Sequence, residues 1–485
     1  MADLIVTNAV VVTVDPERRV LHDAAIAVQG DRISDIGPTD EIRARHSAPE
    51  IIDGRDMVVL PGLIDVHAHA GHGLIKTMAS GDSAAWFDAC LQAYTVASTP
   101  DFWFAEAQLA AVERLRFGVT TGISLLGGGD SIMRTDDPDY GDAHCDGVAE
   151  VGTRSVVAVG TTRPPHPLTY ARWTGETKET FSVDFDRQLA TSLDLIKRRH
   201  GSLGRRINFC LLTPTLRAEH VEDLGEANLE EARRQAKVVS SKAREHGVVF
   251  TQDGHRRGSV KYAQEMGILG PEALLSHSTG LTEEEIEICA ATGTKIAHNP
   301  SAIASIFDRC PATELMQAGV VVAIGSDATA PDRSGDMFRH MQQCMHYHRR
   351  HHRDPSWLPP GKVLEMCTID GARALGMEDD IGSIEVGKKA DLTLVDMRRP
   401  HLYPANMHVS HVVNFANGND VHTVIVDGKV RLRAREVVSV DEGKVLDAAQ
   451  READLMLERS GLRDLLIEPD SFWSSLRMNP GRGAP

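Results

Sequence analysis

The stretch Pro61-Gly62-Leu63-Ile64-Asp65-Val66-His67-Ala68-His69 decides how the rest of the chain is interpreted. An apolar run over residues 57–66 crosses a Pro-Gly corner and ends at two histidines in positions i and i+2. Because side chains alternate along a strand, His67 and His69 leave the same face. At the C-terminal end of a buried strand, that face can present two imidazole nitrogens to one metal ion. Paired histidines are also common on solvated surfaces, so the choice between a metal site and a surface pair depends on the residues downstream.

Composition limits the class of protein. A chain of 485 residues with 42% hydrophobic and 25% charged residues is typical of a soluble globular protein with one large domain and a smaller one. A net charge of −17 disfavours nucleic acid and anionic membranes as partners. The seven cysteines include no CxxC pair, and we find neither a signal-peptide pattern nor an apolar run of about 18 residues. We therefore expect a cytoplasmic protein with reduced thiols.

The pattern of strands predicts the architecture. From about residue 60 to 380, strand-like runs alternate with amphipathic helical stretches, including 102–116, 184–199, 229–246 and 283–292. The eight candidate strands cover residues 57–66, 120–124, 155–159, 207–212, 248–251, 273–276, 295–297 and 320–324. This α/β pattern predicts a (β/α)8 TIM barrel.

The two ends of the chain are rich in short strands. Those after the barrel are expected at 382–385, 391–395, 409–415, 422–426 and 429–432, and a helix is expected at 445–460. We predict that both ends together form a small β-sandwich domain. The predicted division is 1–58 and 381–440 for the sandwich, 59–380 for the metal-dependent barrel, and 441–485 for a C-terminal helix and tail that frays over 479–485.

Polar residues stand where the barrel strands end, which is where active sites of such barrels lie. His67 and His69 end the first strand, His277 ends the sixth, and Asp327 ends the eighth. Taken singly, His277 could be a buried structural histidine and Asp327 a helix cap. Together they predict a site for a borderline divalent cation such as zinc or ferrous iron. The fourth strand contains no lysine that could bridge two ions, so we expect one metal rather than two.

Several motifs resemble the amidohydrolase superfamily. They are Pro61–His69, Leu274–Pro300, Gly325-Ser326-Asp327, Met366–Gly376 and Ile381–Leu392. The nearest branch contains chlorohydrolases and aminohydrolases, among them cytosine and adenosylhomocysteine deaminases and triazine hydrolases. The resemblance implies one divalent metal, zinc foremost with iron or cobalt as alternatives, and a homo-oligomer. It matches His67 and His69 to metal ligands, Asp327 to the ligand that also accepts a proton from water, and His277 to the histidine that touches the water or the substrate oxygen.

The fifth strand departs from this branch, which carries His-x-x-Glu there as a metal ligand and an acid. Here Asp253 falls where the histidine is expected, and the segment that would hold the glutamate is shortened. His255 lies two residues on and shares a face with Asp253 if the strand continues. We predict His255 as the fifth-strand ligand, with Asp253 as the alternative ligand or as an orienting residue. A solvated loop around His255, beside Arg256 and Arg257, is the other possibility.

The missing glutamate shapes the functional hypotheses. Our first hypothesis is a hydrolase of a small-molecule amide, urea or carbamate, similar to phenylurea and molinate hydrolases. Asp327 would act as base and His277 would help to hold the oxyanion. The alternative is an aminohydrolase or dechlorinase of a nitrogen heterocycle (pyrimidine, purine or s-triazine), with His255 or Asp253 replacing the glutamate. A barrel that binds without catalysis is a third class, disfavoured by the four retained residues.

Further residues are candidates for substrate contact. They are His72 in the loop after the first strand, His166 and Trp173 after the third, and His298 in the His-Asn-Pro motif that ends the seventh. For the first three, a plain loop position is the competing interpretation. Gly127-Gly128-Gly129-Asp130 lacks the context of a phosphate-binding loop. The histidine-rich run 346–352 is interpreted as a solvated basic surface rather than a metal site.

Overall fold

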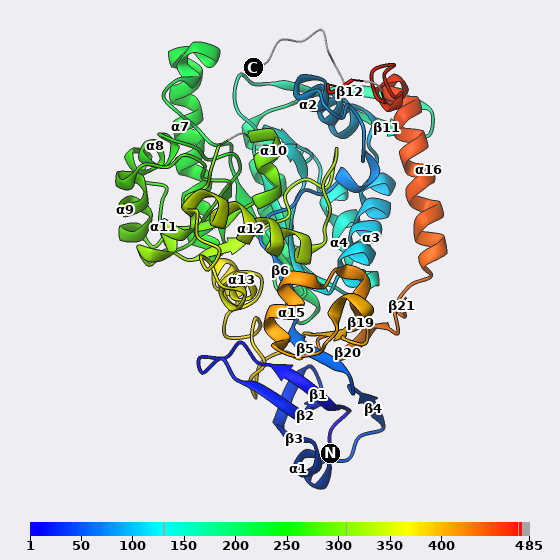
Figure 1. Ribbon diagram of the computed structural model, residues 1–485. Helices are drawn as coiled ribbons and strands as arrows, with labels where there is room; N and C mark the ends of the chain where they lie inside the picture. Colours follow the sequence, from blue (N-terminus) through cyan, green and yellow to red (C-terminus); the bar gives the residue numbers. More distant parts are fainter. Residues whose placement is uncertain (130, 307, 474, 478–485) are drawn as a thin grey trace.

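A parallel barrel forms the centre of the computed structural model, which describes residues 1–129, 131–306, 308–473 and 475–477 (Figure 1). Its eight strands pair in chain order: β6 (Leu63–Asp65), β7 (Val119–Leu125), β10 (Arg154–Gly160), β13 (Ile207–Leu212), β14 (Phe250–Gln252), β15 (Ala273–Ser276), β16 (Lys295–His298) and β17 (Val322–Ile324). The Asp327 amide donates to the His67 carbonyl at 2.8 Å, which joins the last strand end to the first. The predicted (β/α)8 architecture is confirmed.

Helices follow the strands and surround the barrel. They include α3 (Pro100–Arg116), α4 (Pro138–Val151), α5 (Phe185–Arg199), α7 (His220–His246), α8 (Ser259–Met266), α9 (Glu283–Thr292) and α11 (Ala312–Gln317). All four predicted helices in this region are present. The sequence marks both ends of α9. Thr282 and Glu285 form a capping box at its start, and Gly293, with φ 71°, ends it.

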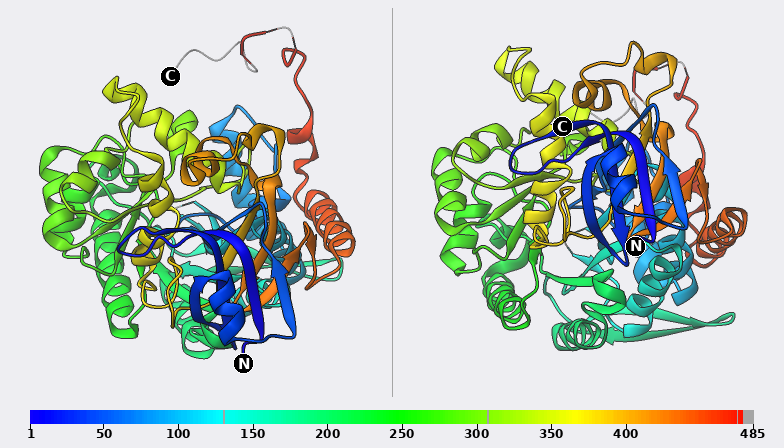
Figure 2. Two further views of the ribbon diagram at one scale, coloured as in Figure 1. Left: turned by 60° about the horizontal axis from the view of Figure 1, so that its bottom comes forward. Right: turned by 90° about the horizontal axis from the view of Figure 1, so that it is seen from below.

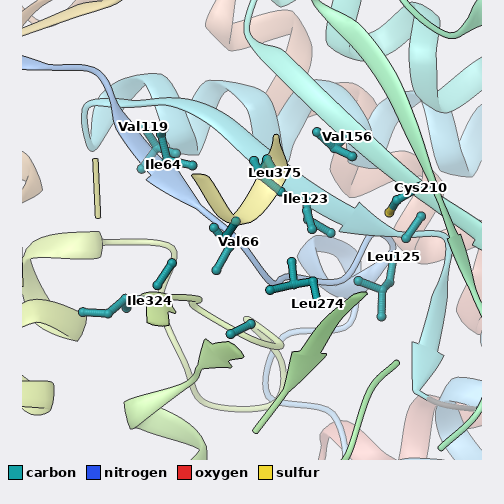
Figure 3. Packing of buried hydrophobic residues seen from close by; sticks show 14 of the residues in the cluster. Ile64, Val66, Val119, Ile123, Leu125, Val156, Cys210, Leu274, Ile324 and Leu375 are labelled. Atoms are coloured by element: carbon teal, nitrogen blue, oxygen red, sulfur yellow. The ribbon is translucent and has the colours of Figure 1, made fainter. Parts of the chain in front are cut away.

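Apolar side chains pack the barrel core. Figure 3 shows Ile64, Ile123, Leu125, Leu274 and Ile324 among them, each no more than 1% exposed. Packing of this kind on several strands fixes the strand ends relative to one another. The polar residues that follow those ends are therefore held on a rigid frame.

The small domain is one sheet built from both ends of the chain. Its strands are β1 (Leu4–Val12), β2 (Val20–Gln29), β3 (Arg32–Pro38), β4 (Glu50–Asp53), β5 (Met57–Pro61), β18 (Leu392–Asp396), β19 (Val421–Val426), β20 (Lys429–Arg433) and β21 (Glu436–Val437). β5 pairs in parallel with β1 and antiparallel with β18, which joins the two ends (Figure 2). The predicted β-rich domain formed by both termini is confirmed.

Three predicted strands need correction. The run 57–66 is two strands in two sheets, separated at Gly62, where a Cβ would lie 2.1 Å from Thr120 Oγ1. Residues 382–385 form no strand; Gly382 has φ 92° and the Ile384 amide bonds to the Thr13 carbonyl. Residues 409–415 lie in helix α15 (His408–Phe415), which packs against α12 (Met337–His352) and α13 (Pro360–Met366). Tertiary packing overrides the strand preference of its valines there.

The C-terminal region has one long helix. α16 (Glu442–Ser460) includes the predicted helix 445–460 and packs along α3 (Figure 1). The predicted frayed end, 479–485, lies outside the described residues. None of the helices in the described part of the chain combines the length and apolar character that a membrane span needs.

A buried ion pair connects the barrel to the small domain. Arg154 on β10 is 1% exposed, and its Nη2 lies 3.1 Å from Asp391 Oδ2 and 2.6 Å from Asp427 Oδ1. Removing one partner of a buried pair leaves charge uncompensated, at a cost of about 3–5 kcal/mol. We expect Arg154→Met to lower the free energy of unfolding by that amount in urea titrations.

A surface arginine provides the control for this prediction. Arg198 is 40% exposed and pairs with Asp194, so Arg198→Met is expected to cost no more than about 1 kcal/mol. Equal losses in the two variants would contradict a special role for the buried pair.

Candidate metal centre

Five side chains converge at the C-terminal end of the barrel. His67 and His69 follow β6, Asp253 follows β14, His277 follows β15, and Asp327 follows β17. Each side chain is at most 9% exposed. Ligand atoms lie within 4.8 Å of one another both in His67, Asp253 and His277 and in His67, His69 and Asp327. Because His67 belongs to both groups, we treat the five residues as one cluster, the strand-end cluster.

Nitrogen and oxygen atoms face each other across this cluster. His67 Nε2 lies 3.2 Å from Asp253 Oδ1 and 3.6 Å from Asp327 Oδ1. His69 Nε2 lies 3.3 Å from Asp327 Oδ1, and His277 Nε2 lies 3.0 Å from Asp253 Oδ1. The side chains therefore direct their donor atoms to a common centre.

Neighbouring groups orient these side chains. His69 Nδ1 donates to the Gly127 carbonyl at 3.0 Å, which leaves the Nε2 lone pair facing the cluster. Ser276 Oγ donates to Asp253 Oδ1 at 2.7 Å. Asp65 accepts from the Ser326 amide at 2.9 Å and from its hydroxyl at 2.6 Å, so the ends of β6 and β17 are tied together.

Two residues of the cluster have an uncommon backbone conformation. His277 and Asp327 both have φ 63°, in the left-handed region. For a non-glycine residue this conformation costs about 1–3 kcal/mol and is concentrated at functional sites. His277 follows β15 directly and Asp327 comes three residues after the end of β17, and both side chains lie in the cluster.

The charges in the cluster fit a cation. Burial lowers the pKa of His67, but the adjacent Asp253 and Asp327 carboxylates raise it to about 10. Burial would raise the pKa of Asp253, yet His67 and His277 hold it well below its ordinary value. Both ring nitrogens of His67 are buried without a hydrogen-bond partner among the described residues. Imidazoles and carboxylates with unsatisfied atoms in this arrangement suit zinc, ferrous iron or cobalt.

The two oxygens of Asp327 have different surroundings. Oδ1 faces His67 and His69, whereas Oδ2 lies 3.2 Å from Arg333 Nη1. Burial would raise the pKa of Asp327, but Arg333, foremost among its charged neighbours, holds it well below its ordinary value. The carboxylate therefore stays ionised while one oxygen faces the imidazoles.

A pocket of about 390 Å³ opens above the cluster. Trp86 and Phe87 of α2 (Ser83–Leu91), His72, Gly128, Gly129 and Arg333 line it together with His69, Asp253, His277 and Asp327. Sequence analysis missed Trp86, Phe87 and Arg333. The one available signal was an adjacent Trp-Phe pair, in the segment after the first strand, in a chain with only 5% aromatic residues.

The prediction that His255 is the fifth-strand ligand is wrong in this geometry. His255 Nδ1 lies 2.8 Å from Ser259 Oγ, and Nε2 lies 3.3 Å from Gln252 Oε1, outside the strand-end cluster. Burial lowers its pKa to about 3. The expected alternation fails because β14 ends at Gln252 and Gly254 turns the backbone with φ 84°. Asp253, our alternative, is the residue that joins the cluster; its role as a ligand remains a proposal.

The other candidates have mixed outcomes. His72 lines the pocket, with its ring 4.7 Å from that of His69 and 5.2 Å from that of Trp86. His166 and Trp173 do not line it, because the segment after the third strand folds into a hairpin, β11 (Leu168–Thr174) and β12 (Thr177–Val183). Trp173 instead donates to the Val96 carbonyl at 2.8 Å.

His298 and the histidine-rich run lie beside the pocket rather than in it. His298 Nε2 lies 3.3 Å from His348 Nε2, and both side chains are buried. The interpretation of residues 346–352 as a wholly solvated surface is therefore wrong for His348, which faces inward from α12. Gly128 and Gly129 line the pocket wall, while Asp130 lies outside the described residues.

Comparison with known proteins identifies the family. Residues 217–431 match the Amidohydrolase family, and residues 24–46 match the bacterial imidazolonepropionase-like composite domain. A 5-methylthioadenosine/S-adenosylhomocysteine deaminase of Desulforudis audaxviator is 30% identical over 448 residues, covering 89% of this chain and 95% of the relative. A 5'-deoxyadenosine deaminase of Methanosarcina mazei is 28% identical, covering 95% and 99%. The zinc-bound crystal structure of an adenosine deaminase from Xanthomonas campestris superposes with a TM-score of 0.80 at 23% identity, covering 94% and 99%.

The chain therefore belongs to the amidohydrolase superfamily, as its motifs predicted. It is a metal-dependent hydrolase that acts on carbon–nitrogen bonds other than peptide bonds. The imidazoles and carboxylates of the strand-end cluster are suitable ligands for a divalent metal. The particular ion, the substrate and the homo-oligomeric state remain predictions.

Proposed function

We propose that this enzyme is an aminohydrolase that replaces the exocyclic amino group of a nitrogen heterocycle, a purine of the adenosine type, with oxygen. The observation that carries the proposal is the strand-end cluster at the floor of a pocket walled by Trp86 and Phe87. Flat aromatic walls suit a planar ring. The deaminases among its relatives support the purine assignment, and so move our preference from the first hypothesis to its alternative.

His67, His69, Asp253 and Asp327 would hold the metal, with His277 at its edge. A bound divalent ion lowers the pKa of water and polarises the group under attack. This donor set contains two carboxylates, so it also accepts ions harder than zinc, such as ferrous iron. Zinc remains our first choice, because a similar structure holds it.

Asp327 and His277 have the placement for proton transfer. Asp327 Oδ1 faces the imidazoles while Arg333 holds Oδ2, so Oδ1 is the atom that accepts a proton from the attacking water. The same oxygen returns the proton to the leaving amino group. His277 Nε2 lies 3.0 Å from Asp253 Oδ1 and 4.0 Å from Asp327 Oδ1, where it can hold the oxygen that forms on the ring.

A second candidate, hydrolysis of an amide, urea or carbamate, is favoured by one specific observation. The carboxylates that line the pocket among the described residues are Asp82, Asp253, Asp327 and Asp332, and no glutamate is among them. Asp253 Oδ1 accepts from the Ser276 hydroxyl and faces the Nε2 atoms of His67 and His277, so we assign the proton transfer to Asp327. One carboxylate, Asp327, suffices for a reaction in which only a leaving amine is protonated.

A product-release assay separates the two candidates. The metal-loaded enzyme would be incubated with adenosine, 5'-deoxyadenosine, other aminopurines, aminopyrimidines, anilides, phenylureas and carbamates. We expect ammonia from the purines, and its loss in His67→Ala. His46→Ala, which removes a histidine of the small domain paired with Asp35, is expected to keep the activity. Free amine from anilides, phenylureas or carbamates, without ammonia, would contradict the proposal and establish the second candidate.

A further inference from the structure

A second group of potential metal ligands lies beside the strand-end cluster. It consists of His298 at the end of β16 and of Cys344 and His348 on α12, and we call it the α12 cluster. Cys344 and His348 are four residues apart, so they share one face of the helix. All three side chains are buried, with no more than 2% of each residue exposed. One ligand atom from each lies within 4.8 Å of the other two.

The distance between the two imidazoles fits a shared ion. Two nitrogens bound to one tetrahedral zinc are separated by about 3.3–3.4 Å, since each Zn–N bond is about 2.0–2.1 Å. His298 Nε2 and His348 Nε2 are 3.3 Å apart. The same separation also allows a hydrogen bond between the two rings, slightly longer than the about 2.7–3.2 Å that is usual for N–H···O bonds. A tetrahedral zinc sets N···S at about 3.6 Å, and the potential ligand atoms of the three residues lie within 4.8 Å of one another.

The polar atoms of the α12 cluster are incompletely satisfied without an ion. His298 Nδ1 and His348 Nδ1 are both buried with no hydrogen-bond partner among the residues the structure describes. If the two rings share a single proton between their Nε2 atoms, one Nδ1 is left as an unpaired donor and the other as an unpaired acceptor. With both Nε2 lone pairs on a cation, the two rings adopt the same tautomer and no longer compete for that proton. Each Nδ1 then carries a proton, so the ion relieves the contact between the two Nε2 atoms and not the unpaired Nδ1 atoms.

We propose that His298, Cys344 and His348 form a second metal site, for a thiophilic cation such as zinc, with three protein ligands. Two imidazoles and a thiolate are a donor set that selects zinc over calcium or magnesium. The site is distinct from the strand-end cluster, which contains no cysteine.

The position of the α12 cluster gives the site a structural consequence. Asn299 follows His298 directly, and its Nδ2 lies 3.4 Å from His277 Nδ1. His277 in turn belongs to the strand-end cluster. An ion that joins the end of β16 to α12 would therefore restrain Asn299, the residue that contacts His277 Nδ1. The α12 cluster would bind its metal ion whether or not a substrate is bound.

Cobalt provides a test that distinguishes the two sites. A thiolate bound to Co²⁺ gives a sulfur-to-cobalt charge-transfer band in the near ultraviolet, whereas histidine and carboxylate ligands do not. The protein would be stripped with chelator and titrated with Co²⁺. We expect two bound equivalents in the wild type and a charge-transfer band that persists in His67→Ala, where one equivalent is lost. Cys344→Ser should lose the band and the other equivalent.

Control variants keep the outcome interpretable. Cys145 is fully buried on α4, so Cys145→Ser matches the loss of a buried helical thiol and should keep the band. His348→Gln leaves the thiol in place and should weaken Co²⁺ binding in the α12 cluster at least about tenfold. This second variant decides the matter if Cys344→Ser does not fold. A single bound equivalent with no charge-transfer band in the wild type, or a band retained in Cys344→Ser, would overturn the proposal.

Discussion

Replacing Asp327 with asparagine is expected to lower kcat/KM by about 10³- to 10⁴-fold, the upper range for loss of a positioned acid–base group. Asparagine has nearly the same size as aspartate, so the hydrogen bond from the amide of residue 327 to the His67 carbonyl can persist. It cannot accept a proton at the position of Oδ1, which faces His67 and His69. Steady-state kinetics on the best substrate from the release assay measures the effect.

A matched control is Asp420→Asn in the small domain. Asp420 is also buried and lies 2.9 Å from the Nε2 atom of a histidine, His401. We expect this variant to keep kcat/KM within about threefold of the wild type, because Asp420 belongs neither to the strand-end cluster nor to the residues that line the pocket. An Asp327→Asn enzyme with near wild-type turnover would mean that the proton acceptor is another group.

Replacing Asp253 with alanine is expected to weaken binding of the divalent ion at the strand-end cluster by at least about 100-fold, the upper end of what an outer partner of a metal site costs. Its carboxylate lies within 3.2 Å of the Nε2 atoms of both His67 and His277. Without the Asp253 carboxylate, the buried rings of His67 and His277 face less negative charge. The measurement is metal content by mass spectrometry after dialysis against graded chelator.

His255→Gln is the control for this prediction, since His255 bonds to Ser259 and Gln252 away from the cluster. It should retain the ion. Asp253→His should also bind the ion, because an imidazole nitrogen is as suitable a zinc ligand as a carboxylate oxygen. Loss of the ion in His255→Gln and its retention in Asp253→Ala would reverse the assignment of the fifth-strand ligand.

The barrel and the strand-end residues could be predicted because they depend on the periodic pattern of apolar residues. The barrel follows from apolar runs alternating with amphipathic helices, and the positions of His67, His69, His277 and Asp327 follow from the rule that strands end at the active site. These predictions require only the order of elements. Errors of a few residues at strand boundaries leave them unchanged.

The failures have local physical causes. His255 was chosen on a period of two, but Gly254 takes φ 84° and breaks the alternation two residues past the end of β14. The valines of α15 suggest a strand, and packing against α12 and α13 makes it a helix. Arg333 and Trp86 reach the pocket from loops and short helices whose course no periodicity encodes. His348 is four residues from Cys344 on one helix, yet only the tertiary structure brings His298 to them.

Anomalous diffraction at the zinc absorption edge, from crystals of the zinc-loaded enzyme, tests whether the strand-end cluster binds the metal. We expect a strong peak at the C-terminal end of the barrel, surrounded by His67, His69, Asp253 and Asp327, with His277 adjacent. Absence of a peak between these side chains in a zinc-loaded crystal would contradict this expectation.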